Sequence, residues 1–344
     1  MRGRGATAIL VLAGLLVVAC VLAAGVGAVS IPPGRSVAIL AHALGLGSPG
    51  DWLHHEEVIL TTIRIPRVLV AVLAGGGLAL SGAVMQGIFR NPMADPGVIG
   101  VSSGASLGSV IALYAGWAAA SVLWLPATAF AGALLCSFLV YGIATSRGRT
   151  PVSTLLLAGI AVGGMAVSLT SLVLFLSLAN YEVGRQMMLW LMGGLDGRGW
   201  LHVRLAAAPV LLGSAWLCLY ARDLNVLLTG EESAMALGID VPRTRRRLLV
   251  LSVLVTAATV SVAGVVSFVG LVVPHILRLV LGPDHRRLLP ASFLGGALFL
   301  VLADLACRTM VESEELRLGV VTSLIGGPFF IYLLIQNRRR TETL

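Results

Sequence analysis

The chain has 344 residues, of which 57% are hydrophobic and 12% charged, and its formal net charge is +8. A soluble globule of this length needs far more surface charge, so the composition indicates a polytopic membrane protein. All 24 basic residues are Arg, and the lack of Lys excludes a Walker A phosphate loop. The Arg lie at the ends of apolar runs, where topology signals are a better interpretation than nucleic-acid contacts. The four Cys stand singly in apolar runs, so neither a zinc nor an iron–sulfur site is predicted.

The first predicted span covers residues 6–29 and is too long for a signal peptide. Residues 30–62 form a long outer connection that contains His54, His55 and Glu56. These three residues could in principle bind a metal ion. A solvated loop surface is favoured, because adjacent residues on a helix point in different directions.

The second predicted span covers residues 63–88 and opens with Arg64 and Arg67, which are three residues apart and share a helix face. Positive charge on the outer side opposes the usual bias, so this pair calls for an explanation. On the inner side, Asp95 is expected to cap the next helix, with Pro96 at its first position.

The third span carries Gly100, Gly104 and Gly108, a ridge of small residues that favours close packing against another helix. These glycines do not form a nucleotide site, because no βαβ unit surrounds them. A fourth span is predicted over residues 122–144.

Residues 151–179 form the fifth predicted span, which begins with Ser153 and Thr154 and is rich in hydroxyl groups. Such groups either bond neighbouring helices or line a pathway, and the sequence leaves both open. Residues 180–200 are predicted to be an outer interfacial piece, followed by a sixth span that ends near residue 220.

The seventh span covers residues 248–268. The run 275–281 after Pro274 is too short to cross a membrane alone, so a broken or partly inserted helix is predicted. His275 could relay protons, but a hydrogen-bonded core His is favoured.

A ninth span ends outside near Arg308, and a tenth span, residues 318–336, returns to an inner Arg-rich tail. Most Arg fall on the inner side of this threading, which predicts about ten spans with both termini inside.

One polar stretch, TGEESAMALGIDVPRTRRR, interrupts this apolar sequence between the sixth and seventh spans. Thr229 and Glu232 have the spacing of a capping box. Gly238 is expected to end the short helix, Asp240 to cap the next one and Pro242 to lie in its first turn. The stretch is interpreted as a small helical handle held by a partner, although a capped connector whose Arg fix topology is the simpler alternative.

Four motifs in this order resemble one known family. They are RIPRVLVAVLAGGGLALSGAVMQGIFRNPMADPGVIGVSSGAS, GEESAMALGIDV, FVGLVVPHILR and LGVVTSLIGGPFFIYLL. The chain is similar from about Ile63 to Leu334 to the FecCD family, the permeases of binding-protein-dependent ABC importers for iron chelates and cobalamin.

The resemblance implies an all-α polytopic membrane protein of the type II ABC importer permease class, with about ten transmembrane helices per subunit. It implies one transmembrane permease domain over residues 1–344 with a cytoplasmic coupling loop at about 221–247. The expected partners are a second permease copy, a cytoplasmic ATPase dimer that binds ATP and Mg²⁺, and a periplasmic or lipid-anchored substrate-binding protein. The chain itself is expected to be no enzyme, to hold no metal or cofactor and to lie in the inner membrane.

By resemblance, the family's coupling helix falls on Gly230 to Leu237. The residues implied to contact the ATPase are Gly230, Glu231, Glu232, Ala234 and Leu237.

The same resemblance places the outer residues that dock the binding protein at Arg64, Arg67 and Arg308. A local alternative exists for Arg308, because Asp304 lies one helical turn before it. The fifth and tenth spans would line the pathway, with Ser153 and Thr154 near its inner gate.

The function predicted is ATP-driven inward transport of an iron chelate, either a siderophore or haem, with cobalamin as the alternative cargo. A rival of another class is an ion-coupled secondary transporter, which places ionisable residues at mid-membrane. Asp304 is the clearest acid within a span. A purely structural membrane scaffold is a third possibility, against which the polar handle argues.

Overall fold

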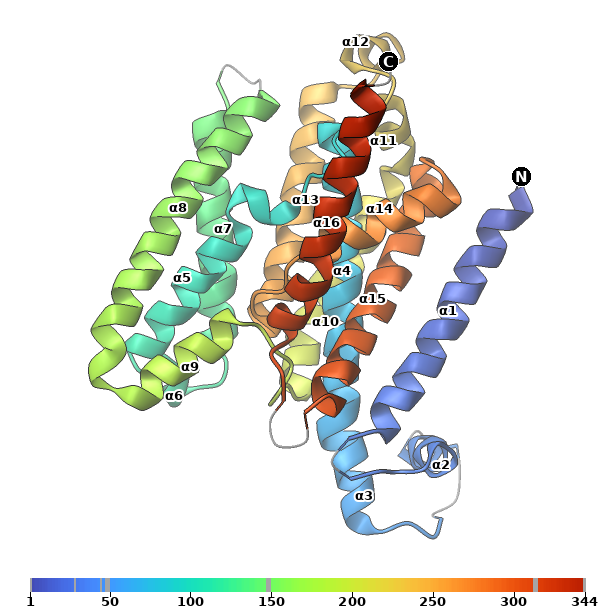
Figure 1. The fold of residues 1–344 in the computed structure, drawn as a ribbon, viewed down its shortest axis with the longest axis vertical. Coiled ribbons are helices and arrows are strands. Elements are labelled where there is room, and N and C mark those ends of the chain that lie inside the picture. Colours follow the sequence, from blue (N-terminus) through green and yellow to red (C-terminus); the bar gives the residue numbers. More distant parts are fainter. Residues whose placement is uncertain are drawn as a thin grey trace.

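The computed structural model describes residues 2–27, 29–43, 45–46, 50–146, 150–311 and 315–342. The regular elements in these residues are all helices (Figure 1). Seven helices of the described chain are long and apolar enough to cross a membrane. They are α1 (Arg2–Gly25), α4 (Ile65–Phe89) with the turns before it, α7 (Trp124–Ala144), α8 (Val152–Leu176) with the turn after it, α10 (Trp200–Leu219), α13 (Val241–Ala263) and α15 (His285–Thr309).

Three further helices are apolar but shorter over their apolar part: α5 (Val101–Tyr114), α14 (Val269–Leu281) and α16 (Leu318–Glu342). Together these ten helices correspond to the ten predicted spans. The short connecting helices are α2 (Pro33–Ala43), α3 (His54–Val58), η1 (Ile59–Arg64), η2 (Pro96–Ile99), α6 (Trp117–Ala120), η3 (Ser177–Ala179), α9 (Tyr181–Leu191), α11 (Ala221–Leu227) and α12 (Glu231–Ala236).

The two ends of the bundle carry different elements (Figure 1). The marked N- and C-termini and α12 lie toward one end, here called the α12 end, whereas α2, α3, α6 and α9 lie at the opposite end, here called the α3 end. The placement of both termini and the polar handle on one side agrees with the threading derived from the Arg pattern.

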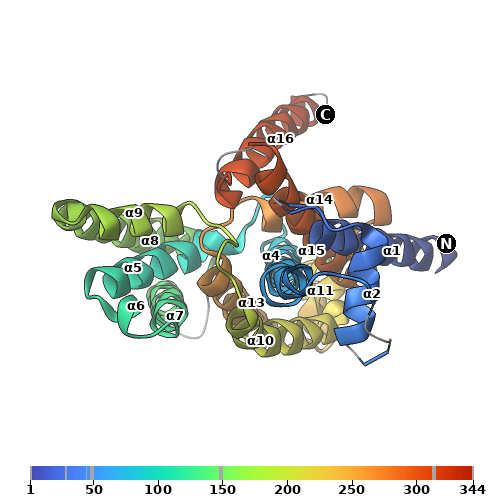
Figure 2. The same cartoon turned by 90° about the horizontal axis from the view of Figure 1, so that it is seen from below.

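Helix α4 is the centre of the bundle, with α10, α13, α14 and α15 packed around it (Figure 2). Of the residues in its most apolar stretch, 89% are buried. The contacts are close because glycines meet: a Cβ on Gly75 would overlap the carbonyl oxygen of Gly296 in α15, and one on Gly82 that of Gly270 in α14. Small residues at such crossings let helix backbones touch in a membrane.

Helices α5, α7 and α8 form a separate wing beside this centre (Figure 2). The predicted glycine ridge is confirmed, because Gly104 and Gly108 pack directly on the backbone of α7 at Gly132 and Thr128. Asp95 is an N-cap, as predicted, since its Oδ1 accepts a hydrogen bond of 2.7 Å from the backbone N–H of Gly97. It caps the short helix η2, however, and not the next span α5, whose N-cap is Gly100.

The predicted break at Pro274 is wrong in its position. Helix α14 runs through Pro274 without interruption and begins instead at Val269, directly after its N-cap Phe268, which has a left-handed φ of 67°. Pro274 has no N–H to donate to the carbonyl of Gly270, four residues earlier. The side chain of Gln86 in α4 supplies donors there, with Nε2 3.4 Å from the Gly270 carbonyl oxygen and 3.1 Å from that of Leu271. The helix is nevertheless short, as predicted.

Two predictions about single polar side chains are also corrected. Glu56 is buried, not solvated, because it forms an ion pair of 2.8 Å with Arg35 and accepts a hydrogen bond from the backbone N–H of Leu53. His275 is half-buried and packs edge-on against Phe329 of α16, with ring centroids 6.3 Å apart. Its Nδ1 has no hydrogen-bond partner among the residues that the structure describes, so the predicted hydrogen-bonded core His is not found.

Candidate functional site

The polar handle folds into α12 and the start of α13. Gly230 is the N-cap of α12 with a φ of 117°, and Gly238 follows the helix with a φ of 83°, as predicted. Asp240 caps α13 by accepting a hydrogen bond of 3.1 Å from the backbone N–H of Arg243. The predicted capping box is wrong, because the helix begins one residue later than the box requires and Thr229 Oγ1 instead donates to the carbonyl of Val226.

Glu231 fastens α12 to its neighbours. Its carboxylate forms an ion pair of 2.5 Å with Arg245 in the first turns of α13. The hydrogen bond from Arg245 lowers the pKa of Glu231 below its usual value, and the charge of Arg90 at the end of α4 acts in the same direction. Glu231 therefore holds α12 in place and is only half-exposed.

The outer face of α12 is exposed and mixed in character. Glu232 is exposed, and the side chains of Met235 and Leu237 are 54% and 69% exposed. Ala234 is fully buried beneath them. An acidic group beside two large apolar side chains at the tip of the molecule is suited to contact another protein.

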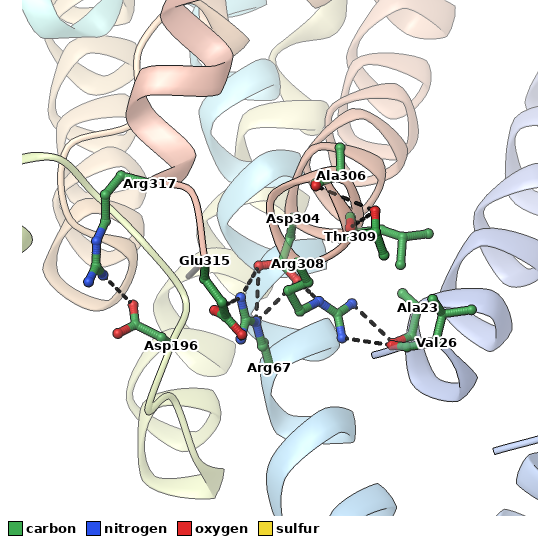
Figure 3. Close-up of polar contacts among 11 residues, drawn as sticks. Ala23, Val26, Arg67, Asp196, Asp304, Ala306, Arg308, Thr309, Glu315 and Arg317 are labelled. Atoms are coloured by element: carbon green, nitrogen blue, oxygen red, sulfur yellow. Dashed lines mark hydrogen bonds and ion pairs between the residues drawn. The ribbon is translucent and has the colours of Figure 1, made fainter. Parts of the chain in front are cut away.

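At the α3 end, four charged residues meet in one cluster (Figure 3). Arg67 of α4 donates from Nη2 to Asp304 Oδ1 of α15 at 2.9 Å and to Glu315 Oε2 at 2.8 Å. Asp304 also forms an ion pair with Arg308, one helical turn later, with 3.1 Å between Asp304 Oδ2 and Arg308 Nε. The structure thus shows the intrahelical pair that was considered as the local alternative for Arg308.

Arg308 and Arg64 also bind the carbonyl groups at the C-terminal end of α1. Arg308 donates to the carbonyls of Ala23 and Val26 at 3.0 and 3.3 Å. Arg64 donates to the carbonyls of Ala24 and Gly25 at 2.9 and 2.8 Å, and to that of Val29. Because the last carbonyls of a helix have no partner within it, these guanidinium groups cap α1.

The structure therefore brings Arg64, Arg67 and Arg308 to the same end, as the resemblance implied, but it buries them. The whole residues Arg64 and Arg67 are 6% and 8% exposed, and the Arg308 side chain is 6% exposed. Sequence reasoning missed Glu315, the most exposed member of the cluster, whose side chain is 45% exposed. No local pattern signals it, since 248 residues separate it from Arg67.

Ser153 and Thr154 lie exposed in the first turn of α8, near the loop that joins α7 to α8. A cavity of about 400 Å³ opens elsewhere, between the end of α9, the link after α13 and the first turns of α16. Its lining includes the hydroxyl-bearing Ser267 and Ser323. The structure does not bring this cavity together with Ser153 and Thr154.

The ten apolar helices and the short exposed helix between two spans fit the ABC importer permease class that the sequence motifs resemble, although a fold alone does not establish a function. The comparisons with known proteins agree. The model of the FecCD transport family matches residues 15–336, and the chain belongs to this family.

Two curated relatives are close in sequence. The cobalamin import system permease protein BtuC of Halobacterium salinarum is 47% identical over 327 residues, covering 90% of this chain and 87% of the relative. The vitamin B12 import system permease protein BtuC of Salmonella typhimurium is 41% identical over 295 residues, covering 85% and 88%. A solved structure described as an inward-facing conformation of a metal-chelate type ABC transporter has a TM-score of 0.83 and 30% identity, covering 95% and 98%.

Proposed function

We propose that the chain is the permease subunit of an ABC importer that moves cobalamin into the cytoplasm. The assignment of cobalamin as the cargo rests on the similarity, at 47% and 41% identity, to permeases named for cobalamin and vitamin B12 import. An iron chelate, the first choice from the sequence, is a second candidate, because the similar solved structure is described as metal-chelate type. That similarity is weaker, at 30% identity.

Energy enters at the α12 end through separate ATPase subunits. Among the residues implied by the resemblance, Glu232 and Leu237 are exposed and suited to touch the ATPase, whereas Ala234 is buried and Glu231 is engaged with Arg245. The proposal thus divides the coupling helix into a contact face and an anchoring residue. Gly230 allows the turn that starts α12, through its positive φ.

The substrate-binding protein docks at the α3 end, over the cluster formed by Arg67, Asp304, Arg308 and Glu315. In this structure Glu315 already neutralises Arg67. A carboxylate of the binding protein can pair with Arg67 only by displacing Glu315, which is the exposed partner, and not Asp304, whose side chain is 2% exposed. Docking at Arg64 and Arg308 requires in addition that they release the carbonyls of α1.

A secondary transporter is disfavoured by the same cluster. Asp304, the acid that such a mechanism would use, is paired with both Arg67 and Arg308. A carboxylate engaged by two guanidinium groups is not free to bind a coupling ion.

The pathway is proposed to run beside α16, along the cavity that contains Ser267 and Ser323, and beside α8, where Ser153 and Thr154 form part of the gate at the α12 end. Two copies of the chain are proposed to enclose it.

Uptake into proteoliposomes tests the proposal. The purified permease, its ATPase and its binding protein are reconstituted, and radiolabelled cyanocobalamin, a ferric siderophore and haem are offered in parallel. Accumulation of cyanocobalamin with ATP, and none with a non-hydrolysable analogue, is expected. The double variant Glu231→Arg with Glu232→Arg should insert normally and transport nothing. Uptake of the siderophore or haem alone would overturn the cargo, and ATP-independent uptake would overturn the mechanism.

A further inference from the structure

A polar joint around the buried His285, with Asn225 and Asp284 half-buried beside it, connects three elements at the α12 end. Asn225 lies in α11, the helix that leads directly into α12. Its Oδ1 accepts a hydrogen bond of 2.8 Å from the backbone N–H of His285, the first residue of α15, and lies 2.9 Å from His285 Nδ1. Its Nδ2 donates to Asp284 Oδ1 at 2.6 Å.

These bonds fix the tautomer of His285. Since the amide nitrogen of Asn225 faces Asp284, its oxygen faces His285 and can only accept, so His285 Nδ1 carries the proton. Nε2 is then a bare acceptor. It is buried, and it has no hydrogen-bond partner in the part of the chain that the structure describes.

Gly87 of α4 lies against this imidazole. A Cβ added at Gly87 would stand 2.8 Å from His285 Nε2 and 3.0 Å from Leu224 Cδ2 of α11, which is closer than side-chain contacts normally allow. The glycine therefore lets α4, α11 and α15 touch at one point. The adjacent Gln86 bonds α14.

Asp284 completes the joint as the N-cap of α15, accepting a hydrogen bond of 3.1 Å from the backbone N–H of Arg286. Burial alone would raise the pKa of its carboxyl group. The hydrogen bond from Asn225, the bond from the Arg286 N–H, and the charges of Arg286 and Arg287 lower the pKa below its usual value. The group facing Asn225 Nδ2 is thus a carboxylate.

The two helices reached by the joint extend to the cluster at the other end. From Gly87 to Arg67, α4 spans about 30 Å at 1.5 Å per residue. α15 runs beside it from His285 to Asp304 and Arg308, and the two backbones touch at Gly75 and Gly296. A displacement of α11 that moves His285 therefore acts on a stiff pair of helices joined at both ends.

We propose that Asn225 is a positioning residue of transport, which passes movement of α12 to α4 and α15 through His285 and Asp284. This role rests on the proposed function, in which an ATPase holds α12. It does not require Asn225 to touch the ATPase, the cargo or the pathway.

The variant Asn225→Asp tests this role. It keeps an acceptor for His285 but places a second carboxylate against Asp284, where the wild-type distance is 2.6 Å. In proteoliposomes with the ATPase and binding protein, we expect cyanocobalamin uptake per ATP hydrolysed to fall at least about fivefold, the lower range of a typical coupling energy. Adding Asp284→Asn restores an amide opposite a carboxylate and should recover most of the loss.

Asn180→Asp is the matched control. Asn180 is the exposed N-cap of α9 at the α3 end, where its oxygen accepts from the backbone N–H of Val183. A carboxylate caps a helix equally well, so this variant should match wild type.

A second variant covers the case in which Asn225→Asp does not reach the membrane. Gly87→Ala removes none of the groups that form the hydrogen bonds of the joint and favours helix formation, but it inserts a methyl group between α4 and His285. It should lower uptake per ATP in the same direction. Wild-type coupling in Gly87→Ala or Asn225→Asp, or no recovery with Asp284→Asn, would overturn the positioning role. Failure of the wild-type complex to take up cyanocobalamin would instead overturn the proposed function.

Discussion

Asp304 is the residue on which the cluster at the α3 end depends. It is buried, accepts hydrogen bonds from Arg67 and forms an ion pair with Arg308. Without this carboxylate, two guanidinium groups would face each other in a poorly solvated place. The buried charges of Arg67, Asp304 and Arg308 stabilise one another, so removing one of them destabilises the others.

We therefore expect Asp304→Asn to destabilise the protein by about 3–5 kcal/mol, the usual cost of removing one partner from a buried ion pair. Thermal unfolding in detergent measures this change. Asp196→Asn is the control, because the Asp196–Arg317 pair of 2.8 Å is partly exposed and worth about 0–1 kcal/mol. Equal losses of stability in the two variants would contradict the buried-set interpretation.

Substitutions at Glu231 and Glu232 should have different effects, although the two residues are adjacent. Glu231→Gln removes the charge that binds Arg245, so α12 should exchange its amide hydrogens faster in the isolated permease. Glu232→Gln alters only the exposed face and should leave that exchange unchanged. Hydrogen–deuterium exchange followed by mass spectrometry makes the comparison. Identical exchange in the two variants would remove the anchoring role of Glu231.

At the residue scale, sequence reasoning predicted interaction partners only where they lie one helical turn away. The Arg308–Asp304 pair has helical spacing and was anticipated. The partners of Arg67 could not be predicted, because Asp304 is 237 residues away and only the packing of α15 on α4 brings it close. For the same reason, no motif pointed to Asn225 and His285.

At the scale of elements, turn and cap signals predicted the boundary between α12 and α13. Gly238, Asp240 and Pro242 lie where their backbone preferences require. The capping box failed because Gly230 adopts a φ that few other residues tolerate, and this moves the start of α12 by one residue. The position of Pro274 within α14 could not be foreseen, since the donor that compensates for it comes from another helix.

Gln86 should therefore be needed to keep α14 continuous. We expect Gln86→Met to leave the carbonyls of Gly270 and Leu271 without this donor and to cost about 1–3 kcal/mol. Unfolding in detergent provides the measurement. Gln186→Met serves as control, because the exposed Gln186 donates a hydrogen bond to the exposed Glu182 in α9. A loss no larger than the control's would show that α14 tolerates Pro274 unaided.

At the scale of the whole molecule, hydropathy and the Arg pattern predicted the number of apolar helices and the ends at which the termini lie. They could not predict that α4 is central, because its apolar composition resembles that of its lipid-exposed neighbours. Its repeated glycines carry that information only when their partners in α14 and α15 are known.

The side of the membrane on which the termini lie is a prediction that fusions can check. A reporter enzyme that is active only outside the cytoplasm should be inactive when fused to the C-terminus and active when inserted near Trp117 in α6, at the α3 end. The Arg excess near the α12 end is the physical reason. The opposite pattern of activities would reverse the orientation.

Pairing of two copies is a further prediction at this scale. The apolar side chains of α8 and α16 include several that are strongly exposed, such as Leu157, Ile160 and Leu324. Native mass spectrometry from detergent should give twice the 35.7 kDa of one chain. A species of single-chain mass under conditions that preserve transport would contradict the dimer.

The distance along the chain between Arg67 and Asp304 has a consequence for biosynthesis. Helix α4 leaves the ribosome 237 residues before the acid that neutralises its arginine. Until α15, the ninth apolar helix, is made, the guanidinium group of Arg67 has to stay near the boundary between lipid and water. The contact between α4 and α15 cannot form before then. Nascent chains truncated before α15 are thus expected to remain open and to be degraded by membrane quality control.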